Sequence, residues 1–161
     1  MKAMKRNKFI GACAALLFAF TSCSDHPDFL FKDFFVSVAD ENGAESSRVL
    51  STANNLVITY YFNLVSEELT EPLTVYFDVV IGDGLQENVD FEFQTANRSV
   101  TFNPGIYQRP FRINYLKHEV DPSKDNTIKI VIKETSDPNI TIGYPGPNHK
   151  FSTHEITIYN Q

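Results

Sequence analysis

Cysteine is almost missing from this 161-residue chain, which contains only Cys13 and Cys23. Because both lie within the first 23 residues, the rest of the chain has no thiol with which to form a disulfide. Hydrophobic packing must therefore supply the stability of any domain that follows residue 23.

Positive charge is also scarce. The chain has 14 Lys and Arg residues against 20 Asp and Glu, and four of the basic residues lie among the first eight. A chain that begins at residue 23 keeps 10 basic and 20 acidic residues and a formal charge of −10. Such a surface repels nucleic acid and anionic lipid head groups, so we exclude nucleic acid as a partner.

Long apolar runs are missing as well. The longest, FIGACAALLFAF at 9–20, is shorter than the ~20 residues that a membrane-spanning helix needs. It follows a basic segment and ends at the small polar residues Thr21 and Ser22, a pattern typical of an export signal. The tetrapeptide Phe20-Thr21-Ser22-Cys23 resembles the lipobox of bacterial lipoproteins.

That resemblance implies that residues 1–22 are a signal peptide and that Cys23 becomes the first residue and carries the lipid. Residues 23–33 would then form a tether, and the lipid would anchor the protein in the outer membrane on either its periplasmic or its cell-surface side. A lipobox usually has Leu where this chain has Phe20, and Gly or Ala where it has Ser22. The alternative is an ordinary secretory signal with an incidental Cys23.

No segment beyond residue 33 has a sustained helical period, whereas alternation of apolar and polar residues is frequent. Residues 56–64 place Ile58, Tyr60, Phe62 and Leu64 on one face, and residues 127–134 place three isoleucines inward. The strands predicted in this way are 34–38, 56–64, 73–81, 89–93, 99–102, 110–116, 127–134 and 154–159. About seven or eight strands in one domain over 34–161 predict a single antiparallel immunoglobulin-like β-sandwich. Residues 39–54, rich in Asp, Glu, Asn and Ser, are predicted to be its longest loop.

The order of these strands and turns resembles the Calx-beta domain, a β-sandwich of the immunoglobulin-like class. The motifs that carry the resemblance are VSV at 36–38, VYFDVVIGDG at 75–84, Asp90-Phe91, FNPG at 102–105, IKIVIKE at 128–134, NITIG at 139–143 and HEITIYN at 154–160. The resemblance covers about residues 35–160. It implies the same sandwich, with carboxylates from separate loops meeting at one end in those family members that bind calcium.

The expected calcium site is incomplete in this chain. Asp40 or Glu41 matches its first position and Asp90 its second, but Lys117-His118 stands where the resemblance implies consecutive aspartates. Ca²⁺ needs six to eight oxygen ligands, so a lysine and a histidine at this point predict a degenerate site that holds no metal. Only Glu119 and Asp121 remain as oxygen donors in that loop, and Lys117 could act as a counter-ion to Asp90.

Other candidate sites are weaker. His149 and His154 lie five residues apart across a strand start, which places them on opposite faces, so we expect solvated or rim histidines rather than a zinc pair. No arrangement of serine, histidine and aspartate indicates a nucleophile. Exposed tyrosines could stack on sugar rings; the candidates near turns and strand ends are Tyr107, Tyr115, Tyr144 and Tyr159.

These observations predict a non-catalytic, lipid-anchored binding or interaction module with no cofactor and with a protein or glycan partner. The alternatives are a calcium-dependent adhesion domain, a glycan-binding accessory lipoprotein, a subunit of a surface assembly joined by strand addition, and a hydrolase whose site the sequence does not reveal.

We predict that replacing Cys23 with Ser releases the protein from the membrane fraction, because the acyl chains are its expected membrane attachment. Fractionation and metabolic palmitate labelling of C23S and the parent protein test this. A C23S protein that still partitions with membranes and still takes up label would contradict the lipobox assignment.

Overall fold

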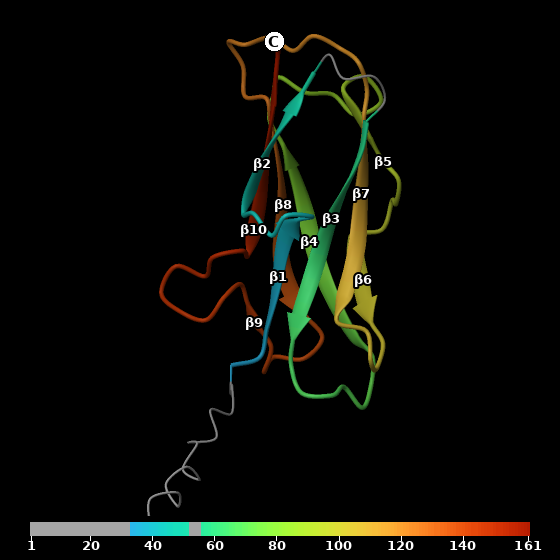
Figure 1. The fold of residues 1–161 in the computed structure, drawn as a ribbon, viewed down its shortest axis with the longest axis vertical. Helices are drawn as coiled ribbons and strands as arrows, with labels where there is room; N and C mark the ends of the chain where they lie inside the picture. The colour runs from blue at the N-terminus through green and yellow to red at the C-terminus, as the bar shows by residue number, and fades with distance from the viewer. Residues whose placement is uncertain (1–32, 52–55) are drawn as a thin grey trace, which may run out of the picture. The chain divides into compact units, whose positions relative to one another are not determined.

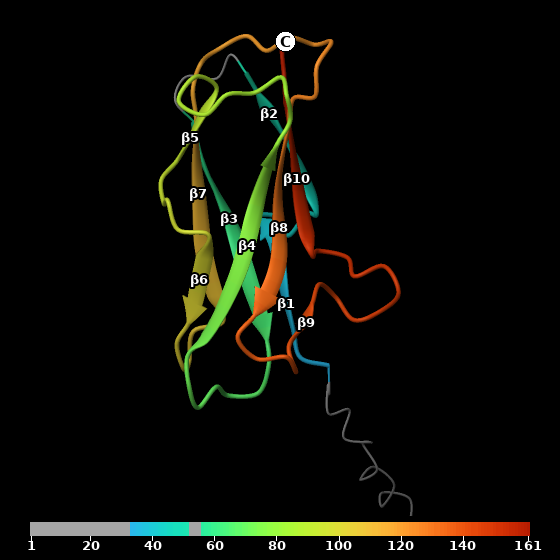
Figure 2. The same ribbon diagram turned by 180° about the vertical axis from the view of Figure 1, so that it is seen from behind.

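Two five-stranded sheets, packed face to face, form the part of the chain that the computed structural model describes, residues 33–51 and 56–161 (Figure 1). In spatial order, one sheet contains β5 (Phe91–Phe93), β7 (Gln108–Tyr115), β3 (Leu56–Val65), β1 (Phe35–Asp40) and β9 (Thr141–Ile142). The other contains β2 (Ser46–Leu50), β10 (Thr153–Tyr159), β8 (Thr127–Thr135), β4 (Leu73–Ile81) and β6 (Ser99–Phe102). The predicted sandwich class is confirmed. Figure 2 shows the second sheet from its outer side.

The predicted signal peptide over 1–22 and residues 23–32 of the predicted tether, Cys23 included, lie outside the described residues. Within residues 33–51 and 56–161, no helix is long and apolar enough to cross a membrane.

Strand alternation builds the core as the sequence predicts. Tyr60, Phe62 and Leu64 of β3 are buried, and so are the three inward isoleucines of β8. The two layers meet through aromatic rings, because Phe77 of β4 lies 4.8 Å from Phe62 and 5.1 Å from Phe111 between ring centroids. Such tilted and edge-on contacts are the favoured geometry for aromatic pairs.

The predicted loop over 39–54 is wrong in its middle, where residues 46–50 form β2. Asp40 closes a turn before β2, since its Oδ1 accepts the N–H groups of Asn42 and Ala44 at 2.9 and 2.8 Å. The strand then pairs with β10 in parallel, from Ser46 opposite Glu155 to Leu50 opposite Tyr159. Only one of its side chains, Val49, is buried. An edge strand with a single buried residue has too little apolar alternation to be recognised in the sequence.

Two strand pairs are parallel, whereas the sequence predicts an antiparallel sandwich. The short β9 runs parallel to β1, as β2 does to β10, while the other strand pairs are antiparallel. With β2 and β9 the described sandwich has ten strands, more than the seven or eight predicted. Both parallel strands lie at sheet edges.

His154 is fully buried, so the prediction that it is solvated or at the rim is wrong. Its Nδ1 lies 3.1 Å from the carbonyl oxygen of Ala44, which can only accept, so Nδ1 carries the proton. Its Nε2, 3.0 Å from Ser47 Oγ, then accepts the serine hydroxyl. The imidazole therefore joins β10 to β2 and to the turn before β2. Beside it lies the ring of Tyr60, whose hydroxyl pairs with that of Tyr115 at 2.7 Å.

We predict that acid destabilises the fold through His154. Burial lowers the pKa of His154 below its ordinary value of 6.5, although Asp40, the Ala44 carbonyl and Glu45 oppose this shift. At a pH between the lowered pKa of His154 in the folded protein and its ordinary pKa in the unfolded chain, the unfolded chain binds the proton and the folded chain does not. The contribution of the neutral His154 to the free energy of unfolding is therefore fully present above about pH 6.5. It falls as the pH drops below this value, until the imidazole of the folded protein also protonates.

Melting temperatures between pH 7 and 5.5 test this. We expect His154→Gln to flatten the profile, because glutamine keeps a donor and an acceptor but does not titrate. The matched control is His149→Asn, which removes an exposed imidazole and should retain the parent slope. A His154→Gln profile as steep as that of the parent would assign the acid sensitivity to other groups.

Candidate functional site

Asp90, the most specific of the predicted calcium positions, is a buried anchor for two loops. It lies directly before β5 and is 4% exposed. Its Oδ2 accepts the N–H of Gln86 at 2.7 Å, and its Oδ1 lies 2.6 Å from Nδ1 of His118. Both carboxylate oxygens therefore already hold partners from the chain itself.

The prediction that Lys117 is the counter-ion of Asp90 is wrong, because His118 occupies that position. The N–H of Leu116 donates to the Asp90 carbonyl at 2.8 Å, and that of His118 donates to the Ser51 carbonyl at 3.1 Å. These bonds fix the residues on either side of Lys117 against neighbouring loops. The lysine is exposed and forms no ion pair with any described residue.

The remaining predicted positions do not converge on Asp90. In the strand register, Asp40 of β1 is opposite Tyr60 of β3, which is opposite Phe111 of β7. Phe91, the residue that follows Asp90, is opposite Tyr115 of β7. Asp90, one residue earlier, therefore lies beside Leu116, and five residues in the strand direction separate the two acids by about 16 Å. Glu41 and Glu119 are exposed.

Asp121 also serves its own loop. Its Oδ1 accepts both the hydroxyl and the N–H of Ser123, and these bonds lower the pKa of the carboxyl below its usual value. Within residues 33–51 and 56–161, no group of three or more His, Cys, Asp or Glu side chains could hold a metal ion. The calcium affinity of the protein stays a prediction.

Close backbone contacts tie the loops at this end together. The side chain of Asn160 forms two hydrogen bonds with the backbone of Val120. It accepts the N–H at 3.0 Å and donates to the carbonyl at 2.7 Å. Gly84 packs so closely against Asn126 that a Cβ there would collide with the amide oxygen. The loop end is therefore a packed structural unit.

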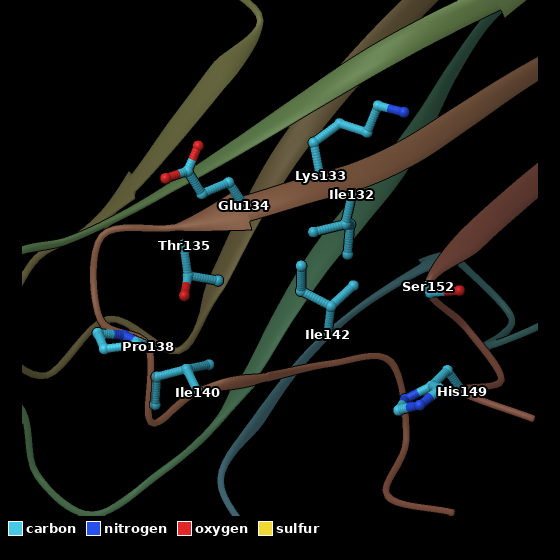
Figure 3. A pocket seen from close by; sticks show the side chains of 9 residues that line it. All are labelled: Ile132, Lys133, Glu134, Thr135, Pro138, Ile140, Ile142, His149 and Ser152. Carbon is cyan, nitrogen blue, oxygen red and sulfur yellow. The ribbon is translucent and has the colours of Figure 1, made fainter. Parts of the chain in front are cut away.

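A groove of about 590 Å³ lies at the opposite end of the second sheet, the lower end in Figure 1, where β8 continues past the start of β10. Figure 3 shows the side chains that line it. Its floor is apolar, and Ile132 of β8 and Ile142 of β9 point toward each other across it. His149 and Ser152 line the side formed by the 143–152 loop. Isoleucines from both sheets thus meet in the groove, where Ile132 is buried and Ile142 is half-buried.

The edge of β8 is open along this groove. Thr153, the first residue of β10, pairs with Val131, and one further bond joins the Ile132 N–H to the Ser152 carbonyl at 2.9 Å. Residues 133–135 of β8 have no strand beside them on this side among the described residues. β4 covers their other side, with Glu134 opposite Tyr76.

The 143–152 loop is held in a strained shape beside the groove. His149 and Phe151 have φ angles of 41° and 62°, and positive φ is costly for a bulky side chain. Compensating contacts hold Phe151: its carbonyl accepts the Val38 N–H at 2.8 Å, its N–H donates to Glu45 Oε1 at 2.9 Å, and its ring lies 4.6 Å from Tyr144. The loop wall is therefore preformed.

Of the four tyrosines proposed for sugar stacking, Tyr107, Tyr144 and Tyr159 are exposed. Tyr115 is buried, and burial raises the pKa of its hydroxyl well above the ordinary value. Tyr159 lies under the guanidinium of Arg48 at 4.4 Å. Of these exposed rings, Tyr144 lines a small hollow of about 220 Å³ on the 143–152 loop.

No protein-family model matches the sequence, and no curated protein matches it either. Among solved structures, the apo-form Calx CBD1 domain aligns with a TM-score of 0.51 and 16% identity, over 79% of this chain and 98% of that one. EndoBT-3987 from Bacteroides thetaiotamicron, solved with a Man5GlcNAc product, aligns with a TM-score of 0.50 and 12% identity. That match covers 75% of this chain and only 30% of the other. These similarities support a Calx-beta-like sandwich fold.

The groove gives no signal in the sequence. Ile132 is predicted as an inward-facing strand position in IKIVIKE, but alternation does not tell whether a covering strand is present. The late start of β10 exposes the groove, and the turn-rich segment 143–152 gives no signal of where the strand begins.

We predict that Asp90→Ala lowers the free energy of unfolding by about 1.5–3 kcal/mol, because the Gln86 N–H and the His118 imidazole lose a charged acceptor. Lys117→Ala is the matched control and should change it by less than about 0.5 kcal/mol. Urea unfolding of the full chain measures both. Equal losses in the two variants would restore Lys117 as the partner of Asp90.

Proposed function

We propose that this protein is a non-catalytic interaction module, held at the outer membrane by a lipid on Cys23, which binds an extended segment of a partner protein. The observation that carries the proposal is the open edge of β8 beside the apolar groove. An open strand edge supplies backbone hydrogen bonds to an added strand, and pockets beside it select that strand's side chains.

The shape of the groove favours an extended polypeptide over a compact ligand. Residues 133–135 offer one short stretch of strand edge, and the floor below it receives side chains that point inward. Successive residues of a strand point to opposite faces, so a bound segment would alternate an apolar side chain toward Ile132 and Ile142 with a polar one toward solvent. This is also the mode by which a subunit joins a surface assembly.

The arrangement of titratable side chains supports a non-catalytic role. His118 and Asp90 are paired, but no serine, threonine or cysteine side chain of the described residues is hydrogen-bonded to the other imidazole nitrogen. A nucleophile activated by histidine requires that contact. Ser47 makes it with His154, but that imidazole is fully buried and its other nitrogen bonds the Ala44 carbonyl and not a carboxylate. The groove itself holds His149 as its one imidazole.

Attachment through Cys23 suits this role. The acyl chains supply membrane affinity without contact between the acidic domain and the lipid head groups. A partner carried by the same membrane would meet the groove at a raised effective concentration.

Site-specific photo-crosslinking in intact cells tests the proposal. A benzophenone amino acid replaces Glu134, an exposed residue at the groove, or Val80, an exposed residue of β4 in the same sheet that serves as the matched control. We expect the Glu134 probe to give one discrete adduct that mass spectrometry maps to a single protein segment, and the Val80 probe to give none. Identical adducts from both positions, or none from the Glu134 probe, would contradict the groove assignment.

A further inference from the structure

A second cleft opens at the other lateral edge of the sandwich, where β6 of one sheet lies beside β7 of the other. Both ribbon views show these two strands side by side (Figures 1 and 2). The cleft has a volume of about 270 Å³, and the side chains that line it include those of Thr95, Asn97, Ser99 and Arg109. Its walls are thus rich in hydrogen-bonding groups.

Arg109 faces the interior of the sandwich. It has the same strand parity as Phe111 and Ile113 of β7, which are both buried. Its Nε is buried and has no hydrogen-bond partner among the described residues. Arg112, of the opposite parity in the same strand, is exposed instead.

Arg98 lies near the same edge, where β6 and β7 are side by side, but it belongs to the other sheet's side. It directly precedes β6 and shares the parity of Val100 and Phe102. Its guanidinium carbon lies 4.3 Å from the centroid of the Phe93 ring, which stacks at 5.7 Å on Phe111 in the cleft wall. Its Nη1 is buried without a partner, as the Arg109 Nε is.

These two arginines differ from the exposed Arg48 and Arg112 in having a buried donor. The formal charge of the whole sequence is −6, yet neither guanidinium forms an ion pair with an acidic group of the described residues. Buried donors without acceptors are costly, and more so when they belong to a charged group. Arg109 lines the cleft, so an anion that enters it would meet that guanidinium.

We propose that this cleft binds a sugar acid, a ring or chain of hydroxyl groups that bears one carboxylate. The planar guanidinium fork matches a carboxylate in a bidentate manner. The side chains of Thr95, Asn97 and Ser99 are donors and acceptors that suit neighbouring hydroxyl groups. The negative charge of the protein disfavours a dianion such as phosphate more than a single carboxylate.

The test uses the full chain and three probes. Glucuronate carries both the carboxylate and the hydroxyl groups, glucose carries the hydroxyl groups alone, and inorganic sulfate carries charge alone. We expect glucuronate to raise the melting temperature and to give a saturable isotherm in calorimetry, with glucose and sulfate much weaker. A response to sulfate or to glucose equal to that of glucuronate would overturn the assignment.

Variants separate a ligand-binding role from a structural one. We expect Arg109→Met to weaken glucuronate binding roughly tenfold or more, while its ligand-free melting temperature stays the same or rises because a buried unpaired donor is gone. Arg112→Met, three residues along the same strand, is the matched control and should bind as the parent does. A destabilised Arg109→Met protein that still binds glucuronate would make the arginine structural and overturn the proposal.

Discussion

The contact between the two sheets is the interaction on which the rest of this structure depends. With no cysteine after residue 23, no disulfide can hold the layers together. The rings of Phe62, Phe77 and Phe111 bridge them instead, and alternation along each strand brings these rings inward. Because every second side chain must enter this space, a polar residue at an inward position has to find a partner or stay unsatisfied.

Three inward polar positions illustrate the two outcomes. His154 has both imidazole nitrogens partnered, and its cost of burial is offset by the link that it makes between β10, β2 and the Ala44 turn. Arg98 and Arg109 each keep a buried donor without an acceptor in the described chain. The first arrangement is typical of a structural residue. The second is typical of a residue whose partner is not part of the chain.

Much of the fold was predictable because the strong strands carry their own signal. The buried isoleucines of β8 and the alternating aromatics of β3 could be assigned without the structure. β2 could not, because one buried valine in five residues is too weak a pattern. The choice of His118 over Lys117 as the partner of Asp90 depends on backbone bonds to Ser51 and Asp90 themselves, which link segments distant in sequence. Such long-range bonds leave no local trace in composition or spacing.

The contact between the sheets is incomplete at the edges of the sandwich. The edges differ in whether another part of the chain covers them. β9 is only two residues long, and the 143–152 loop covers β1 beyond it through the bond from Val38 to Phe151. The edge of β8 at 133–135 has no such cover and lies above an apolar floor. An uncovered edge is a liability for aggregation unless something else pairs with it. A partner segment that occupies this edge, as we propose, would at once complete the sheet and cover the half-buried Ile142, so the groove is best understood as half of an interface.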